Sequence, residues 1–376
     1  MNDPTVERSR SHSAQPSAPI VHLRALAAAP RFSGTASAAH ARTYCADVLR
    51  QLGYRLTERP FEYAAAVGSY GTPLGGAVML AIIAGAATLS LGDRALGALA
   101  VLLFGVAALA IGGRWLARHG VLRLPLMRRT GANLEAVRGG NPPSVWLVAH
   151  VDSKSQPVPL AARAGGIVLL GAAWVAADML ALEALMDHAP RGAWTYVIAS
   201  AIIGAIPVLG STVGRRSAGA VDNASGVAAV LRAAEFLGEQ HDIGVLITDA
   251  EELGLAGARA WCAGRPAGIA LNCDGVDDAG LFTLMWTRPR SARVERALLS
   301  AASERVRVIP LVPGVLVDSL AFSDVGWEAV TLSRGSLATL RRIHTGRDDL
   351  DHLRGDGIEM AARTLAKAAV ALSEHA

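Results

Sequence analysis

The sequence predicts an α/β protein, a mixed and mostly parallel sheet flanked by helices, that is interrupted by two transmembrane helical hairpins. Strand-like stretches alternate with amphipathic helical stretches through most of the 376 residues, which is typical of a sheet covered on both faces. Four long stretches are almost free of charge, and the mean hydropathy of the whole chain is +0.34 although only 5% of its residues are aromatic. This composition excludes a disordered, fibrous or disulfide-rich chain.

The soluble elements follow from local periodicity and from turn residues. Helices are expected at residues 36–52, 226–237, 256–263, 292–304 and 355–373. Strands are expected at residues 54–63, 132–138, 145–150, 243–248, 270–273, 282–286 and 329–332, and near Val306.

The domain organisation follows from these elements. The first residues are polar, rich in Pro and Ser, and without an apolar signal-peptide segment, so residues 1–35 are expected to form a disordered tail. The α/β domain is expected to be discontinuous, with each membrane hairpin inserted into it. We assign residues 36–63, 114–163 and 215–376 to the α/β domain, residues 74–113 to the first hairpin and residues 164–214 to the second.

Each of the four apolar stretches is long enough to cross a bilayer, which takes about 20 mostly apolar residues. Buried core helices are the alternative, and this alternative is strongest for the third stretch, because Asp178 would lie near the middle of the bilayer at a high cost in free energy. Pairing of spans nevertheless favours a membrane span for the third stretch. If the fourth stretch crossed the membrane without it, residues of one site would lie on opposite sides of the bilayer. The stretches are residues 74–92, 95–113, 164–182 and 192–214.

Arginines set the expected orientation. They follow the second stretch, precede the third and follow the fourth, whereas the opposite ends carry few basic residues. Positive charge accumulates on the cytoplasmic side of membrane proteins. We therefore expect an integral membrane protein with four spans and a cytoplasmic α/β domain, and the lipid bilayer as a partner. The net charge of +4 includes no basic block, so no nucleic-acid partner is expected. The oligomeric state is left open.

Ligand-type side chains stand where the predicted strands stop. In α/β sheets, active groups gather beyond the carboxyl ends of the strands. Converging carboxylates repel one another unless a cation neutralises them, and imidazole with carboxylate but no thiolate suits zinc or a similar divalent ion at an open hydrolytic site. The residues are His150, Asp152, Asp222, Glu251, Glu252, Asp274 and His344.

The motifs around these residues resemble the zinc aminopeptidases of peptidase family M28. The series is AHVDS, AVDNASG, DAEELGL, NCDG and HTGRDDLD, in the order of the family and each at a predicted strand end. The resemblance covers the soluble parts between about residues 36 and 373. It implies an α/β sandwich that holds two Zn²⁺ ions, bridged by one aspartate and one water, and a peptide substrate.

Carried over residue by residue, the resemblance implies a role for each side chain. His150 and Asp274 would bind one zinc ion, Glu252 and His344 would bind the other, and Asp222 would bridge the two. Asp152 would orient the imidazole of His150, and Glu251 would be the general base for a metal-activated water. The acid that follows the histidine, Asp348, is expected to be structural.

Each residue also has a structural alternative. His150 is open to being an ordinary strand-end histidine, Asp222 a helix N-cap, Glu251 and Glu252 helix-start acids, and Asp274 part of a solvated acidic turn, while His352 competes with His344.

Two departures from the family pattern bear on function. Ser319 stands where the family often has a histidine after an aspartate, which leaves Asp318 as a structural or substrate-side acid. A membrane hairpin lies between Asp152 and Asp222, which places the site near the bilayer and favours a membrane-associated or apolar substrate. The leading function is a membrane-anchored aminopeptidase. One alternative is an amidase or deacylase that acts on a non-peptide amide with the same metals, and another is a non-catalytic membrane scaffold. A transporter is the alternative with the least support from the sequence.

Overall fold

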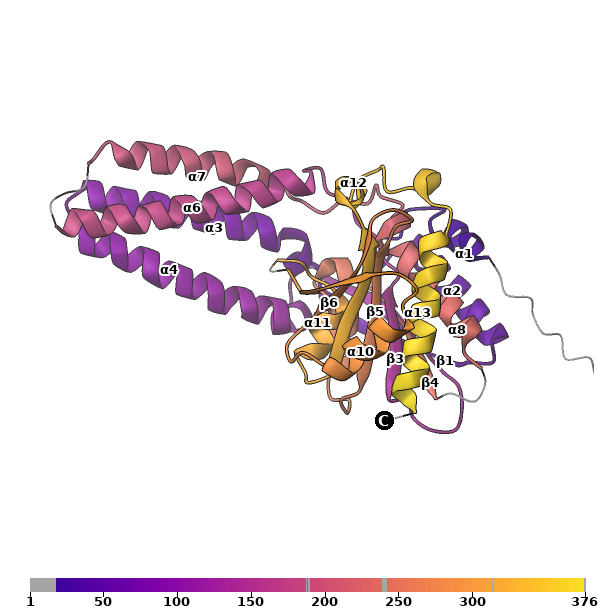
Figure 1. Cartoon of the computed structure of the whole chain (residues 1–376). Helices are drawn as coiled ribbons and strands as arrows, with labels where there is room; N and C mark the ends of the chain where they lie inside the picture. Colours follow the sequence, from indigo (N-terminus) through magenta and orange to yellow (C-terminus); the bar gives the residue numbers. More distant parts are fainter. Residues whose placement is uncertain (1–17, 187, 189, 239–241, 313, 375–376) are drawn as a thin grey trace, which may run out of the picture.

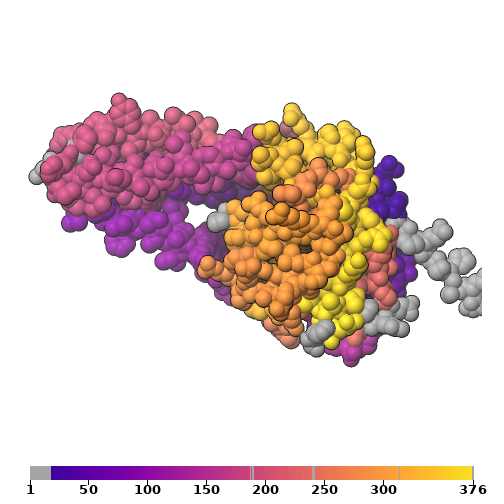
Figure 2. All heavy atoms as spheres, viewed as in Figure 1, coloured from indigo at the N-terminus to yellow at the C-terminus, as the bar shows by residue number. Residues whose placement is uncertain are grey.

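The computed structural model describes residues 18–186, 188, 190–238, 242–312 and 314–374. An eight-stranded sheet with helices on both faces forms one body, and a bundle of long helices projects from its side (Figure 1). The strand order is β1-β2-β4-β3-β5-β8-β6-β7. The space-filling view shows the bundle as an arm attached to the rounded α/β body (Figure 2).

The sheet is mixed, as predicted, with a parallel centre. Strands β4, β3, β5 and β8 run parallel, while β1 and β2 at one edge and β6 and β7 at the other bring in antiparallel pairs. All residues of β3 and β4 are buried, which explains why these strands read as continuous apolar runs. The strands are β1 Arg55–Ala64, β2 Arg128–Val137, β3 Val145–His150, β4 Ile243–Thr248, β5 Ile269–Val276, β6 Leu281–Trp286, β7 Val306–Pro310 and β8 Glu328–Gly335.

Helices cover both faces of the sheet, because apolar side chains of the central strands point alternately to one face and the other. Val145 and Leu147 of β3 face one core, and Trp146 and Val148 face the other. The first core is covered by α1 Pro19–Leu26, α2 Ala36–Gln51, α8 Gly226–Phe236, α10 Ala292–Ala301 and α13 Asp356–Ser373. The second lies under α9 Ala256–Cys262 and α11 Asp318–Ser323, and α12 Leu337–Arg342 follows β8.

The N-terminal segment corrects one expectation. Residues 1–17 lie outside the described part of the chain, but α1 lies within the segment that we expected to be a disordered tail. Leu23 and Leu26 are buried in the main core, against α8 and α13. A helix this short is unstable alone, and burial of its apolar face, which composition does not reveal, is what holds it in place.

Four apolar helices form the projecting bundle. They are α3 Ala65–Leu91, α4 Ala95–Trp115, α6 Leu160–Leu185 and α7 Ala193–Leu209, and α4 continues through a π-helical turn into α5 Val121–Arg123. Three helices in the described part of the chain are long and apolar enough to cross a membrane, namely Ala65–Leu91, Ala95–Arg123 and Leu160–Leu185. The fourth, α7, has 17 residues and is shorter than a typical span.

Small residues let the bundle helices approach closely. A Cβ on Gly166 of α6 would lie 2.5 Å from the carbonyl oxygen of Gly204 on α7, and a Cβ on Gly204 would lie 2.9 Å from that of Gly166. Asp178 is only partly buried in this bundle. The close packing at glycine pairs is the kind that association in lipid requires.

Both helix pairs attach beside the carboxyl edge of the parallel strands. Gly68 in α3 packs on the backbone of Leu253, where a Cβ would come within 2.3 Å of the Leu253 Cα. At the other end of that pair, Arg118 binds Asp324 with an N···O distance of 2.5 Å, and Arg259 binds the same carboxylate at 3.0 Å. The arm is therefore fixed to the body by contacts that surround one edge of the sheet.

Candidate metal centre

The structure brings the predicted ligand residues together at this edge. His150 ends β3, and Asp274 lies near the end of β5. Glu251 and Glu252 lie in a 3₁₀ turn, Glu251–Leu253, that begins three residues beyond the end of β4. Asp222 lies in the kinked turn Ala220–Ser225 that leads into α8, and its own backbone is not helical, with φ −114° and ψ 90°. His344 comes from the loop after α12.

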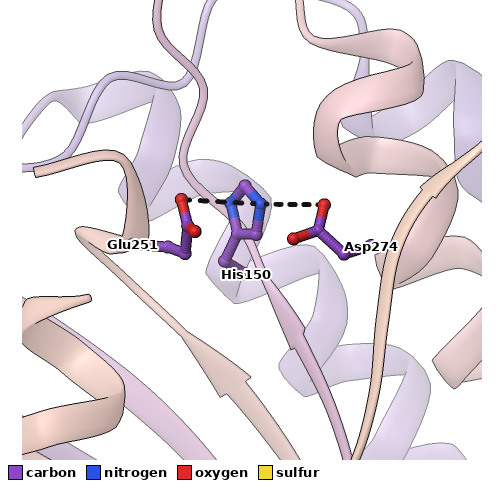
Figure 3. Close-up of side chains that lie close together, drawn as sticks. All are labelled: His150, Glu251 and Asp274. Atoms are coloured by element: carbon purple, nitrogen blue, oxygen red, sulfur yellow. Dashed lines mark ion pairs between the residues drawn. The ribbon is translucent and has the colours of Figure 1, made fainter. Parts of the chain in front are cut away.

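The first group of possible ligands is His150, Glu251 and Asp274, whose ligand atoms all lie within 4.8 Å of one another. Figure 3 shows the two carboxylates on opposite sides of the imidazole. Nε2 of His150 lies 3.6 Å from Oδ1 of Asp274 and 3.9 Å from Oε2 of Glu251. Both His150 and Glu251 are buried, and Asp274 is only slightly exposed, so Asp274 is not part of a solvated turn.

The second group is Asp222, Glu252 and His344. Nε2 of His344 lies 2.9 Å from Oδ2 of Asp222 and 3.4 Å from Oε1 of Glu252. The other oxygen of Asp222, Oδ1, lies 3.3 Å from Nε2 of His150. One carboxylate therefore faces the histidines of both groups, whereas the side chain of Asn223 accepts the hydrogen bond from the amide of Gly226 at the start of α8, at 2.9 Å.

Hydrogen bonds to the backbone fix Asp222. The carboxylate of Asp348 accepts hydrogen bonds from the amides of Val221 at 2.7 Å and Asp222 at 3.2 Å. The side chain of Asn223 donates to the carbonyl oxygen of Cys273 at 2.9 Å and accepts from the amide of Gly275 at 3.2 Å, which ties this turn to the residues on either side of Asp274. Asp348 is thus placed as a structural acid, as we expected.

Asp152 supports the site in a different way from the expected one. The acceptor nearest to Nδ1 of His150 is the backbone carbonyl oxygen of Asp152 at 3.0 Å, while the carboxylate oxygen lies 3.5 Å away. That carboxylate instead accepts hydrogen bonds from the amides of Glu251 at 3.1 Å and Glu252 at 3.2 Å. Asp152 therefore joins the loop after β3 to the turn after β4.

The site concentrates negative charge away from solvent. Burial raises the pKa of Glu251 well above its ordinary value, and neighbouring carboxylates add to this effect. Burial lowers the pKa of His150, but the surrounding carboxylates outweigh it and hold that pKa well above its ordinary value. Burial raises the pKa of Asp318 to about 7, with Oδ2 of that carboxyl accepting a hydrogen bond from Thr248 at 2.5 Å. Such a cluster favours a bound cation.

The polar atoms of the second group also fit a metal ion. Oε1 of Glu252 is buried without a hydrogen-bond partner among the described residues, and it faces His344. The other oxygen, Oε2, binds Nζ of Lys154 at 2.5 Å. The carboxylate therefore keeps one free oxygen, and the donor set of imidazole and carboxylate groups is the kind that binds zinc.

Two residues at the site were missed by the sequence reasoning. Lys154 is one of only two lysines in the chain, with Lys367, although the chain has 36 basic residues. That rarity was a signal that could have drawn attention to it. Arg31, in the supposed tail, gave no signal, yet its side chain is buried beneath the site. His352, the competitor of His344, belongs to neither group of possible ligands in the described residues.

Comparison with known families agrees with this geometry. A family model described as peptidase family M28 matches residues 133–369, more than half of the chain. The chain belongs to peptidase family M28. It is therefore a member of a family of hydrolases, which confirms the family that the motifs predicted.

Solved structures that share the fold of this M28 member include two aminopeptidases and a glutaminyl cyclase. An aminopeptidase from Aneurinibacillus sp. strain AM-1 aligns with a TM-score of 0.54 at 16% identity, covering 94% of this chain and 93% of that chain. A zinc aminopeptidase from Bacillus subtilis aligns with a TM-score of 0.54 at 14% identity, with coverages of 94% and 93%. A glutaminyl cyclase from Bacteroides thetaiotaomicron aligns with a TM-score of 0.52 at 13% identity, with coverages of 94% and 97%. These likenesses show a shared fold. No curated protein matches the chain.

Proposed function

We propose that this M28 member is a membrane-anchored, di-zinc aminopeptidase. The observation that carries the proposal is the pair of adjoining ligand groups with Asp222 between them. In this proposal His150 and Asp274 would hold one ion, Glu252 and His344 would hold the other, and Asp222 would be the carboxylate shared by both. Zinc is favoured by the donor set and by the zinc aminopeptidase among the structures of the same fold.

The residues of the chain then divide the chemical work. When bound, zinc ions supply Lewis-acid polarisation of the scissile carbonyl and make water more acidic. Glu251 accepts the proton of the attacking water and passes it to the leaving amine. Burial and the neighbouring carboxylates raise the pKa of Glu251 above its ordinary value, which increases the affinity of this carboxylate for the proton. Asp152 holds the turn that carries Glu251 in register with His150.

The test combines metal analysis with one substitution. We expect about two zinc ions per chain by mass spectrometry in the wild type and in Glu251→Gln, and loss of aminoacyl-naphthylamide hydrolysis in the variant by about 100- to 10,000-fold. Glu295→Gln is the matched control, because Glu295 is also buried but lies on α10 and pairs with Arg290. No bound metal in the wild type, or full activity of Glu251→Gln, refutes the proposal.

Hydrolysis assays with further substrates separate the aminopeptidase from the alternative functions. Preferred cleavage of N-acyl amino acids would indicate the amidase or deacylase alternative, which keeps the metal site. Because a glutaminyl cyclase shares the fold, a peptide with N-terminal glutamine is included, and mass spectrometry distinguishes loss of ammonia from loss of the first residue. An intact metal site without any of these activities would indicate the scaffold.

We further propose that the bundle spans the membrane four times and that the α/β domain is cytoplasmic. Arg114, Arg118 and Arg163 lie at the domain end of the bundle helices, where the positive-inside rule places the cytoplasm. Trp115 and Val325 are exposed apolar residues near this end of the bundle, since Trp115 precedes Arg118 by three residues and Val325 follows Asp324, which binds Arg118. A short α7 is compatible with a span if the bilayer thins locally.

A cysteine-accessibility map tests this placement. A cysteine at Asp93, at the far tip of the arm, should react with a membrane-impermeant reagent in intact cells, and one at Glu304 in the α/β domain should react only after lysis. The reverse pattern contradicts the orientation. The site's proximity to the bilayer also favours membrane-associated substrates, and equal turnover of soluble and lipid-anchored peptides in proteoliposomes would count against that preference.

A further inference from the structure

The second helix pair leaves the α/β domain between two loops of the metal centre. The chain departs after His150 and Asp152, forms α6 and α7, and returns just before Asp222. The helix pair itself does not determine how far the segment that follows Asp152 lies from the segment that precedes Asp222. Contacts at the base of the pair therefore act together with the hydrogen bonds of Asp348 and Asn223 in setting the separation of His150 from Asp222.

Backbone and serine contacts close part of this base. Ser155 and Gly214 exchange two backbone hydrogen bonds, of 3.0 and 2.7 Å. The hydroxyl of Ser155 also accepts a hydrogen bond from the amide of Arg216 at 2.9 Å. Closer to the site, the hydroxyl of Ser153 donates to the carbonyl oxygen of Ser217 at 3.1 Å.

The guanidinium of Arg31 joins the same two loops from below. Its Nε donates to the carbonyl oxygen of Val151 at 2.8 Å, on the loop that follows His150. Its Nη1 donates to Ala218 at 2.5 Å and its Nη2 to Gly219 at 2.9 Å, on the loop that precedes Asp222. Nη1 also donates to Leu26 at 2.7 Å, the last residue of α1.

The rest of Arg31 is also bound to this base. Its amide donates to the hydroxyl of Ser153 at 3.0 Å, and its carbonyl oxygen accepts from the amide of Ser153 at 3.2 Å. The residue is 1% exposed, and it lies outside the part of the chain that the family model matches. Asp152, Asp222 and Asp348 act on it electrostatically, so its positive charge also offsets part of the negative charge of the site.

We propose that Arg31 is a positioning residue that sets the distance between His150 and Asp222 across the base of the second helix pair, and thereby sets the metal affinity of the site. The proposal rests on the proposed function, because it assumes that His150 and Asp222 bind metal. A planar fork is needed, since one donor must reach Val151 while others reach Ala218 and Gly219. A lysine has a single nitrogen and cannot join both loops in this way.

Arg31→Lys tests the proposal, with Arg138→Lys as the matched control. Arg138 is also buried and donates to three backbone carbonyl oxygens, those of Leu52, Leu237 and Gly238, but it does not contact either loop of the site. The full-length protein is purified in detergent, and zinc affinity is measured by competition with a chromophoric chelator. The visible absorption spectrum of the Co²⁺-substituted protein reports the geometry of the ligands independently of activity.

We expect Arg31→Lys to weaken zinc binding by about 10- to 100-fold and to change the Co²⁺ spectrum, whereas Arg138→Lys changes neither. If both variants lower thermal stability alike and neither changes metal binding, Arg31 is only structural and the proposal fails. Equal effects of both variants on zinc affinity also overturn it. A wild type that binds no zinc refutes the proposed function instead, so the two failures are distinguishable.

A milder variant covers the case in which Arg31→Lys does not fold. Ser153→Ala keeps the guanidinium but removes the hydroxyl that accepts from Arg31 and donates to Ser217. We expect a loss of zinc affinity of about three- to tenfold, in the same direction as for Arg31→Lys. Wild-type zinc affinity and an unchanged Co²⁺ spectrum in Ser153→Ala would overturn the proposal even if Arg31→Lys cannot be purified.

Discussion

In the proposed two-metal site, replacement of Lys154 by methionine should strengthen binding of the ion that Glu252 would hold. The ammonium of Lys154 lies 2.5 Å from Oε2 of Glu252, while Oε1 of the same carboxylate is free to bind metal. Lys154 is only 16% exposed, so water screens its charge incompletely. A divalent ion held by Glu252 would therefore share that carboxylate with the ammonium behind it, and methionine keeps most of the length of the side chain without the positive charge.

The size of the effect follows from Coulomb's law. At an effective dielectric constant of about 20, a unit charge and a divalent charge about 6 Å apart repel by roughly 5 kcal/mol. Solvent at the partly exposed ammonium and adjustment of Glu252 reduce this, so we expect a gain of about 1.5 to 3 kcal/mol, which is about 10- to 100-fold in affinity.

Zinc titration by calorimetry, with tight and weak binding steps resolved, measures the change. Lys367→Met is the natural control, because Lys367 is the only other lysine of the chain and lies exposed on α13. The weaker of the two steps should become tighter in Lys154→Met and stay unchanged in Lys367→Met. Unchanged or weaker binding in Lys154→Met would refute the reasoning, since it would mean that the ammonium supports the site by orienting Glu252 rather than opposing the metal.

Three further predictions concern the backbone, the bundle and pH. Gly219→Ala should lower zinc affinity and thermal stability together, because Gly219 has a φ of +60° and a Cβ would lie 2.4 Å from the carbonyl oxygen of Asp222; wild-type values for both would contradict this. Gly166→Leu should separate α6 from α7, because even a Cβ at this position would lie 2.5 Å from the carbonyl oxygen of Gly204. The separation is measured as loss of a disulfide cross-link between cysteines introduced at neighbouring ends of the two helices. Gly171→Leu, where a Cβ would have open space around it, is the control and should keep the cross-link. The metal-free protein should have a lower thermal unfolding midpoint at about pH 8 than at about pH 5. Burial raises the folded-state pKa of Asp318 to about 7, so the stability that its protonated form contributes is lost as the pH rises through that value. A thermal midpoint that stays constant or rises with pH would contradict this.

Much of the metal centre could be predicted because its residues follow strands that are easy to recognise. His150 and Glu251 come after apolar runs that become β3 and β4, and the parallel order of the strands brings their ends together. Asp222 is found from its motif, but its position between the two histidines depends on contacts with Asp348, which lies 126 positions away in the chain. The metal roles of these residues stay predictions that the zinc measurements test.

The supporting residues could not be predicted, for a physical reason. Arg31 contacts loops that lie more than 100 residues later, and nothing in its neighbourhood distinguishes a buried arginine from one in a polar tail. The 3.5 Å separation between the Asp152 carboxylate and His150 shows the same limit, because sequence spacing placed the residue correctly but did not show which of its oxygens faces the ring. In the fourth apolar stretch, composition predicted a longer helix than α7, which ends at Leu209, soon after Pro207.

The two hydrogen bonds between Ser155 and Gly214 have a consequence for how such a protein arises. They join the chain on either side of the helix pair through N···O distances of 3.0 and 2.7 Å, so α6 and α7 leave and rejoin the fold at one place. Insertions are tolerated where the chain enters and leaves at neighbouring surface positions. The helix pair α6 and α7 is therefore a self-contained insertion. An ancestor without it could acquire it, or an engineer could replace it with a short turn, without changing the order or register of any strand.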